Sequence, residues 1–317
     1  QKWMADHHGW KTECEWMTFI PGIVKGIGMA INALLEKGDK VIIQPPVYHP
    51  FRLVPQKNDA EVVFNPLRQL EDGSYEMDFE NLEAVCDDKC RILILSNPHN
   101  PAGIVWPRET LERLASFCHS RDIIVISDEI HCDMALFGNR HIPFASVSPE
   151  AAACSIIFGA PSKTFNIAGI VSSYSVVPND SLRHRFHEWM EANEMNAAPL
   201  FSPIATIAAF RKGEEWRKQM LEYVEGNINF LTDYCREKMP EIKPLRPQAS
   251  FLVWLDCRSL GLDHDQLIDL FINKAGFALN DGEMFNPGGK GFMRLNAGTS
   301  RDVLRKAMDN LKEAIYK

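Results

Sequence analysis

The amine of Lys163 is the side chain in this sequence that most strongly suggests covalent chemistry. It stands in the segment Gly159-Ala-Pro-Ser-Lys-Thr-Phe-Asn-Ile-Ala-Gly169, directly after an apolar run that predicts a β-strand. A single lysine in such a loop is most often a solvated surface charge. A lysine amine inside a cleft, by contrast, can form Schiff bases with carbonyl substrates and with pyridoxal phosphate. The covalent interpretation therefore requires other polar groups around Lys163.

Such groups follow three other predicted strands. The clusters are Gln44-Pro-Pro-Val-Tyr48, Ser96-Asn-Pro-His-Asn-Pro-Ala-Gly103 and Ser127-Asp-Glu-Ile-His131. In an open parallel sheet, ligands bind in the crevice at the carboxyl ends of the strands. We therefore expect the carboxylate of Asp128, the amide of Asn100 and the amine of Lys163 to converge on one ligand.

The elements that would position these clusters alternate between helices and short β-branched runs from Ile23 to about Val177. This alternation is typical of an α/β domain with a mostly parallel sheet. Apolar spacing predicts one helix that starts near Ile23 and is ended by Gly38, and another that starts at about Pro107. The predicted strands cover residues 41–44, 61–64, 92–96, 123–127, 155–159 and 169–177.

The sequence after Pro178 changes to long helical stretches, predicted over 181–194 and from 203 to about 239. A second α+β segment follows, with predicted strands at 251–255 and 292–296 and a helix over 265–275. Thr299 with Asp302 predicts the N-terminal cap of a closing helix. We therefore expect a large domain, residues 1–215, and a smaller C-terminal domain, residues 216–317.

Length and composition agree with two globular domains, because a chain of 317 residues gives roughly two domains at about 150 residues per domain. The net charge of −8 disfavours nucleic acid and anionic lipid as partners. No apolar run approaches the roughly 18 to 20 residues of a membrane helix, so no membrane association is predicted. The eight scattered cysteines form no CxxC pair, which favours reduced thiols in the cytoplasm over disulfides or metal ligands.

Three segments carry a family resemblance. They are Ser127-Asp-Glu-Ile-His-Cys-Asp-Met134, Ser162-Lys-Thr-Phe-Asn-Ile-Ala-Gly169 and Gly291-Phe-Met-Arg-Leu-Asn-Ala-Gly298. In this order, over the run from about Thr18 to the C-terminus, they resemble fold-type-I pyridoxal-phosphate enzymes of the class I/II aminotransferase superfamily. Within it they are similar to the MalY/PatB group of cystathionine β-lyases, or carbon–sulfur lyases. The resemblance implies an α/β fold with a seven-stranded, mostly parallel sheet flanked by helices, pyridoxal 5'-phosphate as cofactor, and a homodimer with the active site at the subunit interface.

The resemblance also implies a role for each site residue. Lys163 binds the cofactor covalently and later removes the substrate Cα proton as a general base. Asp128 pairs with the pyridine nitrogen and keeps it protonated, which makes the ring an electron sink. Tyr48 stacks on the ring, the alternative being a simple turn aromatic. Asn100 hydrogen-bonds the phenolic oxygen of the cofactor, a role compatible with holding the Asn-Pro turn.

His131 lies where many aminotransferases have a tyrosine, a difference typical of the carbon–sulfur lyase group. It either contacts the phenolic oxygen or is a structural histidine. The cofactor phosphate is expected at the helix start formed by Gly22, Ile23 and Val24, whose backbone N–H groups are free. The hydroxyl of Ser162 is expected to bind the same phosphate.

Arg294 matches the arginine that binds the substrate α-carboxylate through a bidentate pair, the alternative being a surface salt bridge. Two departures from the family stand out. No arginine follows Lys163 closely, so the phosphate must rely more on backbone amides and hydroxyls. Family members also carry a longer N-terminal segment, with an arm and a tyrosine that reaches the partner subunit's phosphate, and the start at Gln1 suggests a fragment.

The sequence therefore predicts a pyridoxal-phosphate-dependent carbon–sulfur β-lyase that cleaves L-cystathionine or a related L-cysteine conjugate to a thiol, pyruvate and ammonia. A class I/II aminotransferase, which uses the same residues for its first steps, is the alternative. Pyruvate release without added keto acid would distinguish the two. A binding or regulatory module that keeps the cofactor site without turnover is a third possibility, disfavoured by the presence of Lys163, Asp128 and Arg294.

Overall fold

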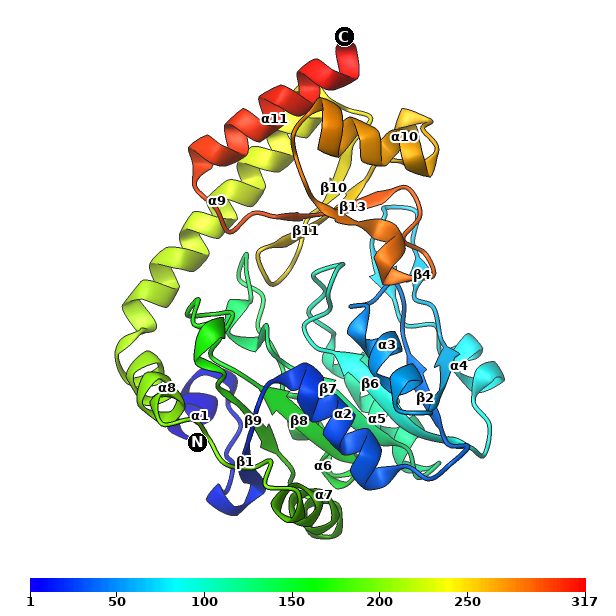
Figure 1. The fold of residues 1–317 in the computed structure, drawn as a ribbon, viewed down its shortest axis with the longest axis vertical. Coiled ribbons are helices and arrows are strands. Elements are labelled where there is room, and N and C mark those ends of the chain that lie inside the picture. The colour runs from blue at the N-terminus through cyan, green and yellow to red at the C-terminus, as the bar shows by residue number, and fades with distance from the viewer.

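A seven-stranded sheet forms the centre of the larger part of the molecule (Figure 1). The computed structural model describes every residue from Gln1 to Lys317. The strands are β1 Met17–Ile20, β2 Lys40–Ile43, β3 Glu61–Phe64, β6 Cys90–Ser96, β7 Ile124–Asp128, β8 Ser155–Gly159 and β9 Ser173–Val176. Their order is β1-β9-β8-β7-β6-β2-β3, parallel from β8 to β3, whereas β9 runs antiparallel to both β1 and β8. The predicted α/β class with a mostly parallel sheet is therefore confirmed.

Strand β6 illustrates why the central runs are apolar throughout. Leu93 and Leu95 belong to the core on one face of the sheet, and Ile92 and Ile94 to the core on the other. Successive side chains of a strand point to opposite faces, so a strand covered on both faces needs apolar residues at every position. The first face is covered by α4 Phe79–Val85, α5 Arg108–His119 and α6 Pro149–Ala153, and the second by α2 Ile23–Leu34, α3 Pro50–Lys57 and α7 Asp180–Ala192.

The C-terminal part contains a second, antiparallel sheet of order β10-β11-β13-β12. Its strands are β10 Lys243–Leu245, β11 Leu252–Asp256, β12 Asn280–Asp281 and β13 Phe292–Asn296, and its helices are α9 Glu214–Lys238, α10 His264–Asp269 and α11 Arg301–Tyr316. One face of this sheet, with Val253, Leu255, Met293 and Leu295, packs in a core with the three helices. The other face, with Trp254 and Phe292, joins one of the cores of the large sheet. Helix α9 runs from the larger part to this smaller one (Figure 1). The domain boundary at residue 215 stays a prediction.

Smaller elements complete the chain. They are α1 Lys2–His8, α8 Phe201–Lys212, the two-stranded pair β4 Arg68–Gln69 and β5 Tyr75–Glu76, and the short helical turns Cys14–Trp16, Cys132–Met134, Phe144–Ser146, Ala168–Ile170, Arg258–Leu260, Leu270–Lys274 and Gly282–Phe285. Every cysteine is a free thiol. None of the helices combines the length and the apolar character that a membrane span needs.

The helical stretch predicted from 203 to about 239 consists of two helices, α8 and α9, which meet at Gly213. A Cβ atom at Gly213 would lie 2.5 Å from the carbonyl oxygen of Ala209 and 2.5 Å from the ring of Phe165. The chain therefore turns under the loop that carries Lys163, where only a glycine fits.

Several predicted element ends differ by a few residues, and the helix predicted over 265–275 is α10 followed by the turn 270–274. Helix α2 ends before Gly38, with Leu35 in extended conformation as its C-cap. The cap of α11 is Ser300 and not Thr299, since its hydroxyl accepts from the backbone N–H of Val303. The strand predicted over 169–177 starts only at Ser173, because a short helical turn precedes it.

Candidate active site

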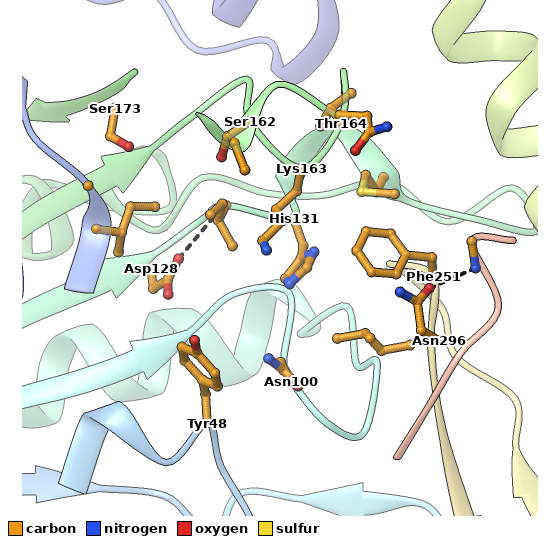
Figure 2. A pocket seen from close by; sticks show the side chains of 18 of the residues that line it. Tyr48, Asn100, Asp128, His131, Ser162, Lys163, Thr164, Ser173, Phe251 and Asn296 are labelled. Atoms are coloured by element: carbon orange, nitrogen blue, oxygen red, sulfur yellow. Dashed lines mark hydrogen bonds between the residues drawn. The ribbon is translucent and has the colours of Figure 1, made fainter. Parts of the chain in front are cut away.

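All the residues predicted for the site line one cavity of about 870 Å³ at the carboxyl ends of the parallel strands. They are Gly22, Ile23, Val24, Tyr48, Asn100, Asp128, His131, Ser162, Lys163 and Arg294. Figure 2 shows the side chains of Asp128, His131 and Lys163 next to one another, with Tyr48 and Asn100 facing them from below. The structure thus brings the predicted set together, and the role of each residue stays a prediction.

Lys163 lies in the tight loop that follows β8. The backbone N–H of Ile167 donates to the carbonyl of Ser162 at 3.0 Å, which closes the loop around the lysine. The strand ends at Gly159, where a Cβ atom would lie 2.5 Å from the ring of Tyr174 in the neighbouring strand. The lysine side chain projects into the cavity and is exposed (Figure 2). Its amine is therefore accessible to a ligand.

Asp128 is the last residue of β7 and is only 7% exposed. One carboxylate oxygen accepts from the backbone N–H of Ile130 at 3.0 Å. Burial raises the pKa of Asp128 to about 7, although this hydrogen bond and the positive charge of Lys163 act in the opposite direction. A carboxylate in this position is stabilised by a ligand that brings a protonated nitrogen to it.

His131 is buried, and its Nδ1 atom has no hydrogen-bond partner. Burial lowers the pKa of His131 to about 3, and the positive charges of Lys163 and Arg294 act in the same direction. The imidazole is therefore neutral near pH 7 and packs edge-on against Phe251. Among the histidines with a buried nitrogen that lacks a partner, only His131 lines the cavity, so its nitrogen is available to a ligand atom.

Arg294 in β13 is held by neutral groups. Its Nη1 donates to the side-chain oxygen of Asn100 at 2.9 Å, and its Nη2 to that of Asn280 at 2.7 Å. The guanidinium carbon lies 4.9 Å from the ring centre of Phe285. The buried Nε has no partner, and burial lowers the pKa of the arginine. A half-buried guanidinium without a carboxylate partner fits a site for an anionic ligand.

Tyr48 follows β2 in the loop that reaches towards the smaller domain. The backbone N–H of Val47 donates to the carbonyl of Phe285 at 3.0 Å, which joins this loop to the smaller domain. Burial raises the pKa of Tyr48, and the negative charge of Asp128 adds to the effect. The phenol is therefore protonated and neutral near pH 7.

The start of helix α2 offers a place for a phosphate. Gly22 is the N-cap, with φ at 125° and ψ at 145°, a conformation that favours glycine. No side chain caps the helix, so the N–H groups of its first turn are open to the cavity. Ser162 and Ser173 supply hydroxyls nearby, and Lys25 supplies a cation on the same wall. Together these groups can replace the arginine that the loop of Lys163 lacks.

Glu129 stands between two site residues but has a structural position. Its buried carboxylate accepts from the Ser127 hydroxyl at 2.9 Å and the Phe144 N–H at 2.8 Å, and lies 2.8 Å from Nε2 of His141. These contacts tie the end of β7 to the segment that follows. These contacts occupy the carboxylate, so it is not available to a ligand in the cavity.

Several cavity residues were not predicted from the sequence. They are Lys25, Thr164, Ser173, Trp216, Met220, Tyr223, Phe251, Asn280 and Asn296. Most lie on α9 or on strands of the smaller sheet, where the rule that ligands bind after parallel strands gives no signal. Thr164 and Lys25 adjoin predicted residues, so proximity in sequence could have found them.

The donor set fits pyridoxal phosphate. An exposed amine is available for the aldehyde, a buried carboxylate for the ring nitrogen and an orphaned imidazole nitrogen for the phenolic oxygen. An uncapped helix start with adjacent hydroxyls suits the phosphate. These groups lie in one cavity that also has room for a small substrate.

Comparisons with known proteins agree with this geometry. The family profile described as aminotransferase class I and II matches residues 1–311. Cystathionine beta-lyase PatB of Bacillus subtilis is 40% identical over 314 residues, which cover 99% of this chain and 81% of that protein. Protein MalY of Escherichia coli is 30% identical over 315 residues, which cover 99% of this chain and 80% of that protein.

The crystal structure of the PLP-bound C–S lyase from Staphylococcus hominis superposes with a TM-score of 0.93 at 32% identity, covering 100% of this chain and 82% of that one. These matches confirm the predicted fold type and the resemblance to the MalY/PatB group. The chain belongs to the class I and II aminotransferase family.

Proposed function

We propose that this chain is a pyridoxal-phosphate-dependent carbon–sulfur β-lyase that cleaves L-cystathionine or a related L-cysteine conjugate to a thiol, pyruvate and ammonia. The observation that carries the proposal is a single cavity that holds an accessible amine, a buried carboxylate and a guanidinium without an acidic partner. The printed names of PatB and of the Staphylococcus hominis enzyme favour lyase activity.

Each proposed role follows from the position of the side chain. Bound pyridoxal phosphate supplies an electron sink for negative charge at the substrate Cα. Asp128 holds a proton on the ring nitrogen, because a buried carboxylate stabilises the adjacent positive charge. Arg294 binds the substrate α-carboxylate through two parallel hydrogen bonds and so orients the Cα–H bond towards Lys163. His131 is neutral and serves as a hydrogen-bonding group.

The amine of Lys163 takes the Cα proton as a general base. The Cβ–S bond then breaks, and the thiolate leaves with the bonding electron pair. Water adds to the remaining three-carbon fragment, which ends as pyruvate and ammonia. An aminotransferase would share the proton removal but return the proton to a different carbon and retain the Cβ substituent.

The decisive experiment supplies the cofactor-loaded protein with L-cystathionine and no keto acid. We expect one pyruvate for each thiol released. Activity that requires a keto acid and leaves the C–S bond intact would instead establish the aminotransferase. Bound cofactor without either product would indicate a binding module.

The position of the reactive lysine is tested separately by borohydride reduction and peptide mapping. We expect the label on Lys163 and its loss in Lys163→Ala. Lys37, which is exposed and lies outside the cavity, provides the control as Lys37→Ala, in which the label should remain. A label on another lysine would contradict the assignment.

A second copy of this chain is the proposed partner. Helix α8 exposes Phe201 at 69%, Ile204 at 59% and Ile207 at 50%, next to Leu200 at 75%. A cluster of exposed apolar side chains of this kind typically marks a protein contact. Sedimentation should give a dimer, and Phe201→Glu with Ile204→Glu should give a monomer.

The proposed compartment is the cytoplasm. Eight free cysteines, six of them buried, suit a reducing environment. Fractionation of cells that produce the protein should recover it with cytoplasmic markers, and recovery with extracellular proteins would contradict this location.

A further inference from the structure

The guanidinium of Arg294 has only uncharged hydrogen-bond partners. Both of its protein hydrogen bonds go to side-chain amides, those of Asn100 and Asn280, and no carboxylate lies within ion-pair distance. Three other half-buried arginines, Arg121, Arg183 and Arg217, pair with carboxylates, whereas Arg52 and Arg301 also contact only side-chain amides. Arg294 is therefore oriented by neighbours that leave its positive charge uncompensated.

Asn280 is placed by strand pairing. It lies in β12 directly opposite Arg294 in β13, so the two side chains are cross-strand neighbours. This register brings its side-chain oxygen to 2.7 Å from Nη2 of Arg294. Asn280 is exposed at the rim of the cavity, whereas Asn100 approaches the same guanidinium from the large domain.

The turn after Asn280 adds a second support. It runs from Gly282 to Phe285 and brings the Phe285 ring to 4.9 Å from the guanidinium carbon of Arg294. A Cβ atom on Gly282 would lie 2.2 Å from the carbonyl oxygen of Gly289, so this turn needs glycine. The segment 280–285 thus contacts the guanidinium of Arg294 twice, through the hydrogen bond to Asn280 and through the ring of Phe285.

The neutrality of these contacts has a functional consequence. An amide oxygen fixes the direction of an N–H bond as a carboxylate oxygen would, but carries no net charge. A carboxylate at the same place would form a charge-assisted pair with the guanidinium and compete with an incoming carboxylate. Asparagine and aspartate have nearly the same shape, so a single substitution separates orientation from charge.

We propose that Asn280 is a positioning residue that orients Arg294 for the substrate carboxylate while leaving its charge free. The identity of the substrate rests on the proposed function, whereas the role of Asn280 concerns how Arg294 receives any amino-acid carboxylate.

The test compares Asn280→Asp with Asn280→Ala in the cofactor-loaded enzyme. We expect Asn280→Asp to raise KM for L-cystathionine about tenfold and Asn280→Ala about two- to threefold, with kcat changed less than about twofold in both. The melting temperature of Asn280→Asp should equal or exceed that of the unmodified enzyme, because the new carboxylate gains a partner. A merely structural role predicts lower melting temperatures and similar losses in both variants.

Asn286→Asp is the matched control, since it adds the same charge at an exposed position of the neighbouring segment. Its KM should stay unchanged. An unaltered KM in Asn280→Asp, or equal effects of the two Asn280 substitutions, would overturn the proposal. So would an equal rise of KM in Asn286→Asp, which would indicate a general charge effect.

Titration with L-alanine keeps this test independent of the lyase assignment. Its amino-acid carboxylate should reach Arg294 even if no cysteine conjugate is cleaved, and the change in cofactor absorbance reports binding. We expect weaker L-alanine binding in Asn280→Asp than in Asn280→Ala. If the unmodified enzyme releases no pyruvate but this order holds, the proposed function fails and the role of Asn280 stands.

Discussion

The two charged ends of the site are built in different ways. Asp128 ends a central strand of the large sheet, is 7% exposed, and takes its one hydrogen bond from a backbone N–H two residues away. Arg294 lies in the antiparallel sheet of the smaller domain and is held by side chains 194 and 14 residues away. The carboxylate end is therefore set by local chain geometry, whereas the guanidinium end depends on how the two domains meet.

This difference has a chemical counterpart. A buried carboxylate destabilises the folded protein unless a positive charge lies next to it. A permanently bound cofactor can supply that charge. A half-buried guanidinium at a cavity rim retains part of its hydration, which suits a ligand that arrives and leaves in each turnover. Charge at Asp128 should thus control the rate of the chemical step, and geometry at Arg294 should control substrate capture.

The largest effect is expected for Asp128→Asn. The variant keeps shape and hydrogen bonding but removes the charge that holds a proton on the ring nitrogen. We expect pyruvate formation to fall on the order of a hundredfold or more, because each roughly 1.4 kcal/mol added to the barrier is about tenfold in rate. Bound cofactor should survive, as measured by absorbance. Turnover near that of the unmodified enzyme would remove Asp128 from the mechanism.

A smaller effect, on KM more than on kcat, is expected for Arg294→Lys. Lysine keeps the positive charge but loses the planar pair of donors. KM for L-cystathionine should rise about tenfold or more, with kcat reduced less. A drop confined to kcat would contradict the idea that Asp128 controls the chemical step and Arg294 controls substrate capture.

The stability of the apoprotein should depend on pH because of the buried carboxylate of Asp128. The pKa of Asp128 is about 7 in the folded chain and about 3.9 in an unfolded one, so the folded state holds the extra proton between these values. The stability of the unmodified apoprotein relative to Asp128→Asn should therefore fall as pH rises from about 4 to 7 and level off above that. Denaturant unfolding of both proteins measures the difference, in which contributions from buried histidines cancel. A pH-independent difference would contradict the burial of this charge.

The smallest effect is expected from a change that weakens the smaller domain without touching Arg294. Asp263 and Gln266 form a capping box at the start of α10, with bonds of 2.9 and 3.0 Å. Asp263→Ala should cost about 1 kcal/mol of stability and leave KM and kcat unchanged. A raised KM would mean that the guanidinium end responds to the stability of its domain as well as to direct contacts.

The sequence by itself determined the central strands and the polar clusters that follow them. The runs at 61–64 and 155–159 form strands with the predicted bounds, because β-branched and aromatic residues in a short run give a local strand signal. Parallel strands then place their carboxyl ends at one edge, so Asn100, Asp128 and Lys163 could be expected together without knowledge of long-range contacts.

Only the tertiary structure decided the direction of β9, its pairing with β1, the break between α8 and α9, and the partners of Arg294. The antiparallel pair of β1 and β9 joins residues more than a hundred positions apart in numbering, such as Thr18 and Ser175. The break at Gly213 depends on the ring of Phe165, and the orientation of Arg294 depends on Asn100 from the other domain. Periodicity and loop composition report the surroundings of a residue along the chain, whereas these features arise from atoms that only folding brings into contact.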